Sequence, residues 1–254
     1  MGRLDGCVAI VTGGAKGIGK VYSEALAAEG ARVCVADIAD GSELAAAIAA
    51  RHGDDRALAV SFDVSSEPDV ERVVSATKTR WGRIDVLVNN AALFSTLQPT
   101  EPWQIDVALW DRVMAVNVRG PFLMVKHVAP HMIAAKYGKI INIASGTAYR
   151  GIPHMAHYVT SKGAMLGFTR ALSRDLGKHG IRVNTLAPGL IMSDSIMANT
   201  EHIDEMRDAV IAARSIKRDG HPEDLIGALV FLASGESDFV AGQTLAVCGG
   251  TTST

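Results

Sequence analysis

The stretch Thr12-Gly13-Gly14-Ala15-Lys16-Gly17-Ile18-Gly19 decides the fold, because it joins an apolar run to a segment with helical spacing. Cys7–Thr12 is apolar and β-branched and predicts a buried strand, while Gly17–Gly30 repeats its apolar residues on one helical face. Glycines at such a junction permit positive φ and close approach of a phosphate, which the first amides of the helix then bind. The spacing Gly-x-x-x-Gly-x-Gly leaves two interpretations open, a phosphate-binding turn and a plain tight turn.

Strand-like and helix-like segments alternate along the rest of the chain. The predicted strands are Cys7–Thr12, Arg32–Asp37, Ala57–Phe62, Asp85–Val88, Lys139–Ala144, Arg182–Leu186 and Thr244–Val247. The predicted helices are Gly17–Gly30, Ser42–Arg51, Glu67–Trp81, Ala108–Lys136 with a bend or break at Gly120-Pro121, His157–His179 and Pro222–Ala233. Continuous apolar strands between helices indicate an α/β fold with a doubly wound parallel sheet of the Rossmann type. Without a linker or repeat, residues 1–254 are expected to form a single domain.

Composition narrows the class of protein. The net charge of −2 offers no basic field for nucleic acid or for an anionic membrane surface. The three cysteines are too few and too scattered for a disulfide framework or a CxxC zinc site. No apolar run is long enough to span a bilayer. We therefore expect a cytoplasmic enzyme without nucleic-acid or membrane partners.

One segment departs from the alternation. Pro188–Arg218 follows a Pro-Gly pair and scatters leucine, isoleucine and methionine among polar residues. A long excursion of this kind inside a compact domain is often a functional lid, and we expect one near residues 190–217. A helix pair that merely packs on the sheet edge is the alternative.

Asp37 ends the second predicted strand, about 20 residues after the glycine turn, where an acid can accept hydrogen bonds from a ribose 2′-hydroxyl. The same carboxylate would repel a 2′-phosphate, which favours NAD over NADP. Lys16 acts in the opposite direction, because a cation in the turn could bind that phosphate. We give Asp37 more weight because it would face the 2′ position itself.

Tyr158 and Lys162 stand at i and i+4, on one face of a predicted helix. A phenol is a poor base at neutral pH, but a nearby ammonium would lower its pKa. The spacing alone is common. Its location is more informative, because Asp63, Asn89, Ser145 and Pro188 each follow or end a predicted strand. The carboxyl ends of parallel strands form the edge where doubly wound sheets bind ligands.

Taken in order, these segments resemble the short-chain dehydrogenase/reductase family in its single-domain form. The resemblance covers essentially the whole chain. It is carried by Thr12–Gly19, Asn89-Asn90-Ala91-Ala92, Asn117, Ser145, Tyr158-x-x-x-Lys162 and Pro188-Gly189. There are two departures: Ala92 stands where the family often has glycine, and Cys248 where an aspartate commonly precedes Gly-Gly.

The resemblance implies a role for each matching residue. Tyr158 would be the general acid or base, Lys162 would lower its pKa and bind the nicotinamide ribose, Ser145 would orient the substrate oxygen, and Asn117 would hold a relay water. The implied cofactor residues are Gly13, Lys16, Gly17, Ile18, Gly19, Asp37, Asp63, Val64, Asn89, Pro188, Gly189 and Ile191. No metal is expected, and the His127/His131 pair is interpreted as helix surface because no acid follows His127.

The substrate side is expected to be apolar, without an arginine or lysine placed to hold an anion. The candidate lining is Leu93, Phe94, Thr147, Tyr149, Met155, Met192 and Ile196. This favours a hydrophobic secondary alcohol or its ketone, of aryl or cyclic type. Within the family, His157–Ile181 and Phe231–Val247 resemble both 1-phenylethanol dehydrogenases and 3-oxoacyl-carrier-protein reductases, and the latter are the alternative function.

Two further points rest on the resemblance. A non-catalytic nucleotide-binding sensor is the alternative from another class, although it would have little use for Ser145, Tyr158 and Lys162. The resemblance also implies a homotetramer, with the helices around Ala108–Lys136 and His157–His179 in one interface and the C-terminal strand in another.

Overall fold

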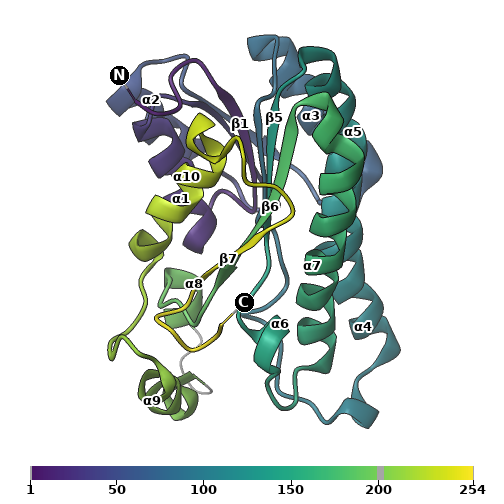
Figure 1. The fold of residues 1–254 in the computed structure, drawn as a ribbon, viewed down its shortest axis with the longest axis vertical. Coiled ribbons are helices and arrows are strands. Elements are labelled where there is room, and N and C mark those ends of the chain that lie inside the picture. The colour runs from purple at the N-terminus through teal and green to yellow at the C-terminus, as the bar shows by residue number, and fades with distance from the viewer. Residues whose placement is uncertain (1, 199–202, 254) are drawn as a thin grey trace.

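The computed structural model describes residues 2–198 and 203–253, and Figure 1 shows its layers. Seven parallel strands form one sheet in the order β3-β2-β1-β4-β5-β6-β7 among the described residues. The strands are β1 (Val8–Thr12), β2 (Arg32–Asp37), β3 (Ala57–Ser61), β4 (Val86–Asn89), β5 (Gly138–Ile143), β6 (Ile181–Pro188) and β7 (Thr244–Val247). The doubly wound parallel sheet expected from the sequence is confirmed.

Helices cover both faces of this sheet. Figure 1 places α1 (Gly17–Ala28), α2 (Ser42–His52) and α10 (Ile226–Ala233) on one side. It places α3 (Glu67–Trp81), α4 (Val107–Met114), α5 (Gly120–Ala135) and α7 (Ala156–Leu176) on the other. The short helices α6 (Thr147–Arg150) and α8 (Asp194–Met197) lie with α9 (Ile203–Ala213) toward the carboxyl ends of the strands.

The alternation of side chains along each strand produces two cores. In β1, Ala9 and Val11 pack with Leu26 of α1, whereas Ile10 points to the opposite face and packs with Val73 of α3. All of these side chains are fully buried. Burying one such side chain contributes about 1.5–3 kcal/mol relative to leaving it exposed, so both faces hold their helices firmly. That rigidity fixes the strand ends on which the site is built.

The segment Ala108–Lys136 differs from the prediction at its centre. A bend or break at Gly120-Pro121 was expected, but α4 continues into α5 through a π turn, Ala115–Arg119. Proline is tolerated at the start of a helix, where its missing N–H would have no intrahelical partner, and Pro121 occupies that position in α5. The interruption is therefore a change of helical type before Gly120, not a break after it.

The segment proposed as a lid contains α8 and α9, and it returns to the sheet edge through the main chain of Ile191 and Gly220. Residues 199–202, which belong to this segment, lie outside the described residues. Across the described chain, no helix combines the length and apolar character that crossing a membrane requires.

Candidate active site

The glycine turn forms a cradle at the start of α1. Gly13 and Gly17 have φ of 62° and 53°, values that favour glycine. A Cβ added to Gly19 would lie 1.9 Å from the carbonyl oxygen of Gly13, so the turn accepts no side chain there. No side chain caps the amino end of α1, which leaves its first amides free to bind an anion. These features fit a dinucleotide pyrophosphate.

The Asp37 carboxylate organises the same turn. One of its oxygens accepts a hydrogen bond from Ala15 N at 2.9 Å and the other accepts one from Ala39 N at 3.0 Å. Asp37 also lines the cavity beside Lys16 and Ile38. Each carboxylate oxygen has a second lone pair, so this acid can still accept hydrogen bonds from a ligand. Ile38, which is 75% exposed, was not predicted from the sequence.

Thr12 and Asn90 join the two central strands where the sheet order changes direction. Thr12 Oγ1 accepts hydrogen bonds from the amides of Asn90 and Ala91, both at 3.0 Å. The Asn90 side chain in turn donates to the carbonyl oxygens of Thr12 and Gly13. Strand β1 lies between β2 and β4, so this is the switch point at which open α/β sheets bind ligands.

Ser145, Tyr158 and Lys162 meet at the adjacent strand end. Ser145 follows β5 by two residues, and its Oγ accepts a hydrogen bond from the Thr147 amide at 3.2 Å. Tyr158 and Lys162 lie on α7, with Lys162 Nζ 5.9 Å from the centre of the Tyr158 ring. Lys162 Nζ donates to the carbonyl oxygen of Ile143, the last residue of β5, at 2.8 Å. All three side chains line one cavity.

Burial dominates the protonation of this group. It raises the pKa of Tyr158 to about 12, against the lowering effect of a hydrogen bond with Ser145. It also lowers the pKa of Lys162 to about 8. The sequence argument expected the neighbouring ammonium to depress the tyrosine pKa, but in the chain alone desolvation by burial raises it. Tyr158 is consequently a protonated phenol at neutral pH.

Asn117 lies in the π turn, with 1% of its surface exposed. Its Oδ1 accepts a hydrogen bond from Leu93 N at 2.7 Å, and its Nδ2 donates to Leu93 O and to Ser161 Oγ. Since Ser161 precedes Lys162, Asn117 ties α7 to the loop after β4. π turns often occur at functional sites, but the sequence pattern gave no sign of this one. The water-holding role expected for Asn117 stays a prediction.

One cavity of about 630 Å³ contains most of the predicted residues. Those that line it are Gly13, Lys16, Gly17, Ile18, Gly19, Asp37, Asp63, Val64, Leu93, Phe94, Ser145, Thr147, Tyr158, Lys162, Pro188, Gly189, Ile191 and Ile196. Five predicted residues lie outside the lining: Asn89, Asn117, Tyr149, Met155 and Met192. The size suits a dinucleotide with a small substrate beside it.

The comparisons with known proteins agree with this geometry. A family model described as enoyl-(acyl carrier protein) reductase matches residues 13–252. Sorbitol dehydrogenase of Cereibacter sphaeroides is 41% identical, with 98% of each chain covered. Galactitol 2-dehydrogenase of Agrobacterium fabrum is 40% identical, again with 98% of each covered. A solved structure from Sinorhizobium meliloti, classified as a short-chain alcohol dehydrogenase, superposes with a TM-score of 0.90 at 33% identity, covering 98% of this chain and 97% of that one.

This chain is a short-chain dehydrogenase/reductase. It belongs to an oxidoreductase family whose members use NAD or NADP, and the resemblance inferred from its motifs is confirmed. The family's ordered motifs gather at one sheet edge here, which explains why their order in the sequence was informative.

The substrate end of this short-chain dehydrogenase/reductase is less apolar than expected. Leu93, Phe94 and Ile152 form an apolar wall, and the rings of Phe94 and Tyr158 lie 4.5 Å apart. Arg150 also lines the cavity. Arg150 is an exposed member of the lining, so the expectation that the lining is apolar and holds no arginine is wrong. The sequence did not predict α6, and without that turn Arg150 could not be placed on the same side as Thr147.

Three candidate pocket residues do not line the cavity. Tyr149 packs with Met165 in a core formed by α7 and β6, because α6 turns it away from Thr147. Met155 is buried in the same apolar cluster as Tyr158 and Leu97, so it packs as part of the core around the tyrosine. Met192 joins the main chain of Gly220 through its amide.

The lid segment lines the cavity through both of its helices. Ile191, Ser193, Ser195 and Ile196 reach it from the approach to α8 and from α8 itself, and Ala209 and Val210 from α9. A Cβ added at Gly17 would meet Ser195 Oγ at 2.8 Å, so α8 rests directly against the glycine turn. Movement of this segment stays a prediction.

At the family position where aspartate is common, Cys248 is a buried free thiol. It does not line the cavity. A Cβ added to Gly189, a lining residue, would lie 2.9 Å from Cys248 Cα, so the two segments pack closely.

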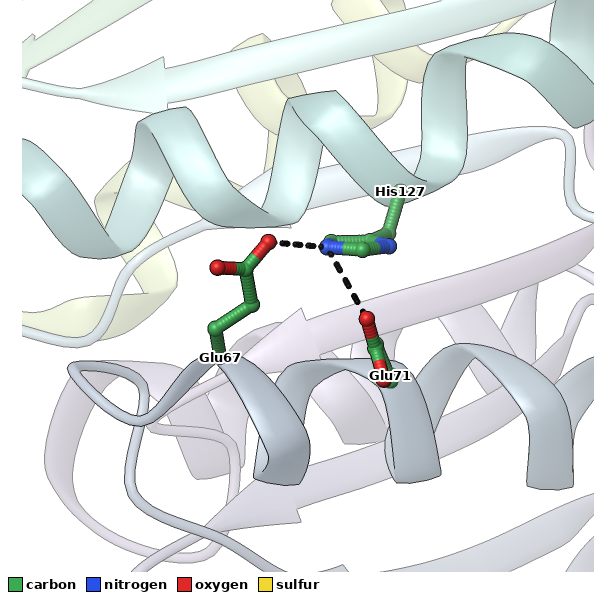
Figure 2. Close-up of side chains that lie close together, drawn as sticks. All are labelled: Glu67, Glu71 and His127. Carbon is green, nitrogen blue, oxygen red and sulfur yellow. Dashed lines mark hydrogen bonds and ion pairs between the residues drawn. The ribbon is translucent and has the colours of Figure 1, made fainter.

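His127 does not pair with His131. Its Nε2 lies 2.9 Å from Glu67 Oε1 and 3.8 Å from Glu71 Oε1, between α3 and α5 (Figure 2). Three such ligand atoms could hold a metal, but Lys126 Nζ already pairs with the same Glu67 oxygen. We assign the group to an ion-pair network that joins α3 to α5, away from the cavity.

Proposed function

We propose that this protein is an NAD(H)-dependent oxidoreductase that interconverts a secondary alcohol bearing an apolar substituent and its ketone, with Tyr158 as general acid or base. The observation that carries this proposal is one continuous cavity that joins the glycine turn and Asp37 to Ser145, Tyr158 and the apolar wall. A reacting carbon at Tyr158 would therefore share one enclosure with a nicotinamide.

The chain's own residues supply the proton chemistry. Bound NAD would supply the hydride acceptor, and NADH the hydride donor. Tyr158 holds the proton at its phenol oxygen, because burial raises its pKa to about 12. Ser145 is close enough to hydrogen-bond the phenol and so can orient a substrate oxygen beside it. In ketone reduction the phenol gives its proton to the oxygen as the carbonyl carbon gains hydride, which leaves a phenolate. In alcohol oxidation the phenolate takes the proton from the hydroxyl as hydride leaves the carbinol carbon.

Lys162 keeps this proton transfer aligned. Its ammonium is fixed to the end of β5 by the hydrogen bond to Ile143 O. Its pKa of about 8 leaves most of it charged at neutral pH, and this charge favours the phenolate that forms after proton transfer.

The cofactor assignment rests on Asp37. Its carboxylate borders the cavity at the end of β2, where it would meet the ribose hydroxyls of NAD and repel a 2′-phosphate. Lys16 borders the cavity as well and would attract that phosphate. We infer NAD because Asp37 is held toward the turn by two amides, whereas Lys16 is exposed.

Polyol oxidation is a second candidate. Two of the relatives are named for sorbitol and galactitol. The feature that favours it here is the presence of Thr147 and Arg150 in the cavity lining together with the apolar residues. Reduction of 3-oxoacyl-carrier proteins remains a third candidate function, and it predicts a preference for NADPH.

A spectrophotometric screen tests these candidates. Aryl ketones, polyols and acyl thioesters would be offered with NADH or NADPH, and with the oxidised cofactors for alcohols. We expect NADH-dependent reduction of aryl ketones. Absence of turnover with every substrate would contradict the enzyme assignment and favour a nucleotide sensor.

We also propose a homotetramer. Within the described sheet, β7 pairs with β6 on one side only, and Leu245 of β7 and the nearby Phe239 are exposed. Phe122 of α5 is 51% exposed on a different surface. Light scattering of the purified protein should give four times the chain mass.

A further inference from the structure

The short helix α6 places two polar side chains on one face, directly after Ser145. Thr147 and Arg150 are three residues apart, and both line the cavity. Ala148 and Tyr149, which lie between them, do not. One turn of helix therefore separates Ser145, which would orient the substrate oxygen, from the guanidinium group of Arg150.

Neither side chain has a partner in the described chain. The Thr147 hydroxyl is a buried atom without a hydrogen bond among the described residues. Arg150 has no ion pair or hydrogen bond from its guanidinium among the same residues, and it carries five N–H donors. Arg218, by contrast, is paired with Asp224. Arg150 is solvent-exposed and the Thr147 hydroxyl is buried, and both can form hydrogen bonds with a ligand that enters the cavity.

The acids of the cavity are too distant to neutralise Arg150. Asp37 and Asp63 lie at the ends of β2 and β3, whereas α6 follows β5. Strands β1 and β4 stand between β2 and β5, so their ends are separated by roughly 14 Å at the usual strand spacing. The other cations that line the cavity are already placed elsewhere: Lys162 on Ile143 O, and Lys16 at the glycine turn.

We propose that Thr147 and Arg150 form a subsite for a carboxylate on the substrate, several bonds from the carbinol carbon. This inference rests on the proposed function, which places that carbon at Tyr158. A single guanidinium fork matches one carboxylate bidentately. The apolar wall of Leu93, Phe94 and Ile152 would hold the carbon skeleton between the two polar ends. The substrate class is then a hydroxy acid or oxo acid with an apolar spacer.

A matched pair of ketones tests the subsite. Acetophenone and 4-acetylbenzoate share the ring and the ketone and differ by the carboxylate. We expect the wild-type enzyme with NADH to reduce 4-acetylbenzoate with a kcat/KM roughly 10- to 100-fold above that for acetophenone, the range for a hydrogen-bonded charge. Arg150→Gln should remove this preference by lowering kcat/KM for 4-acetylbenzoate far more than kcat/KM for acetophenone. Thr147→Val should weaken it partly.

The control is Arg51→Gln on α2, an exposed arginine far from the cavity, which should keep the wild-type preference. Equal use of both ketones by the wild type, or an equal loss on both in Arg150→Gln, would overturn the subsite. A rise in the KM for NADH in that variant would also overturn it, because Arg150 would then serve the cofactor.

Binding separates this inference from the proposed function. Calorimetric titration of benzoate into the NADH-bound protein needs no turnover. Benzoate binding that Arg150→Gln abolishes, without reduction of either ketone, would support the subsite and contradict the proposed function. Ketone reduction without benzoate binding would support the proposed function and contradict the subsite.

Discussion

Lys162 Nζ lies 2.8 Å from the carbonyl oxygen of Ile143 and donates a hydrogen bond to it. Ile143 ends β5, and Ser145 follows two residues later. This hydrogen bond connects the helix that carries Tyr158 to the strand end that precedes Ser145. A second one, from Asn142 Nδ2 to Thr169 Oγ1, joins the same helix and strand farther from the site.

Tyr158→Phe should lower kcat by at least ~10³, because it removes the phenol that exchanges the proton. The KM for NADH should change little, and circular dichroism should match the wild type because the ring keeps its contact with Phe94. Steady-state kinetics with a ketone found in the screen provide the measurement. Turnover near the wild-type rate would exclude Tyr158 as the acid.

Lys162→Met should change how stability depends on pH. The lysine has a pKa of about 8 in the folded chain against an ordinary 10.5, so between these values the unfolded state binds the proton more tightly. Its burial therefore costs stability below pH 8, up to about 3 kcal/mol at about 1.4 kcal/mol per pKa unit, and nothing above 10.5.

The variant lacks this penalty. Its stability relative to wild type should be greatest below pH 8 and should decline as the pH rises toward 10.5. Urea unfolding at several pH values measures this difference, with the exposed Lys178→Met as control. A difference that stays constant with pH would show that Lys162 titrates normally.

Gly19→Ala should abolish binding of the cofactor. Its Cβ would lie 1.9 Å from Gly13 O, so the turn must open to admit it. Gly227→Ala in α10 is a matched control, because nothing lies within 4 Å of its Cβ. That control should gain about 0.5–1 kcal/mol from helix propensity. NADH fluorescence and thermal unfolding report both effects, and full NADH binding by Gly19→Ala would contradict the cradle.

Asp37→Ala should narrow the preference for NADH over NADPH, since it removes the charge that opposes a 2′-phosphate. It should also weaken the binding of both cofactors, because the amides of Ala15 and Ala39 lose the carboxylate that accepts their hydrogen bonds. The ratio of kcat/KM for the two cofactors isolates the first effect from the second. An unchanged ratio would show that Asp37 only supports the turn, whereas a wild-type preference for NADPH would give Lys16 the larger influence.

The sequence was most informative where function depends on backbone periodicity. Strand and helix alternation follows from hydrophobic spacing, and strand ends in a parallel sheet meet at one edge, so Asp37, Ser145 and Tyr158 could be brought together without a structure. The ends of the predicted strands and helices differ from those in the structure by a few residues. Ser145 and Asp63, for instance, follow their strands by two residues instead of ending them.

What the sequence could not supply depends on orientation in space. The four-residue helix α6 places Arg150 in the cavity lining and Tyr149 in a neighbouring apolar core. Four residues are too few to show a helical period in the sequence. The raised pKa of Tyr158 arises from burial by Met155 and Leu97, which no local pattern reveals. The contact of His127 with Glu67 joins helices 60 residues apart in the chain.

The π turn at Ala115–Arg119 makes the register of α4 and α5 sensitive to the number of residues between them. A π turn holds one residue more than an α-helix would over the same stretch, so deleting one residue there would restore an ordinary helix. Asn117 would then be carried away from Leu93 and Ser161, although no bonding partner had been mutated. The number of residues in this turn, and not only the identity of each side chain, is thus a determinant of this active site.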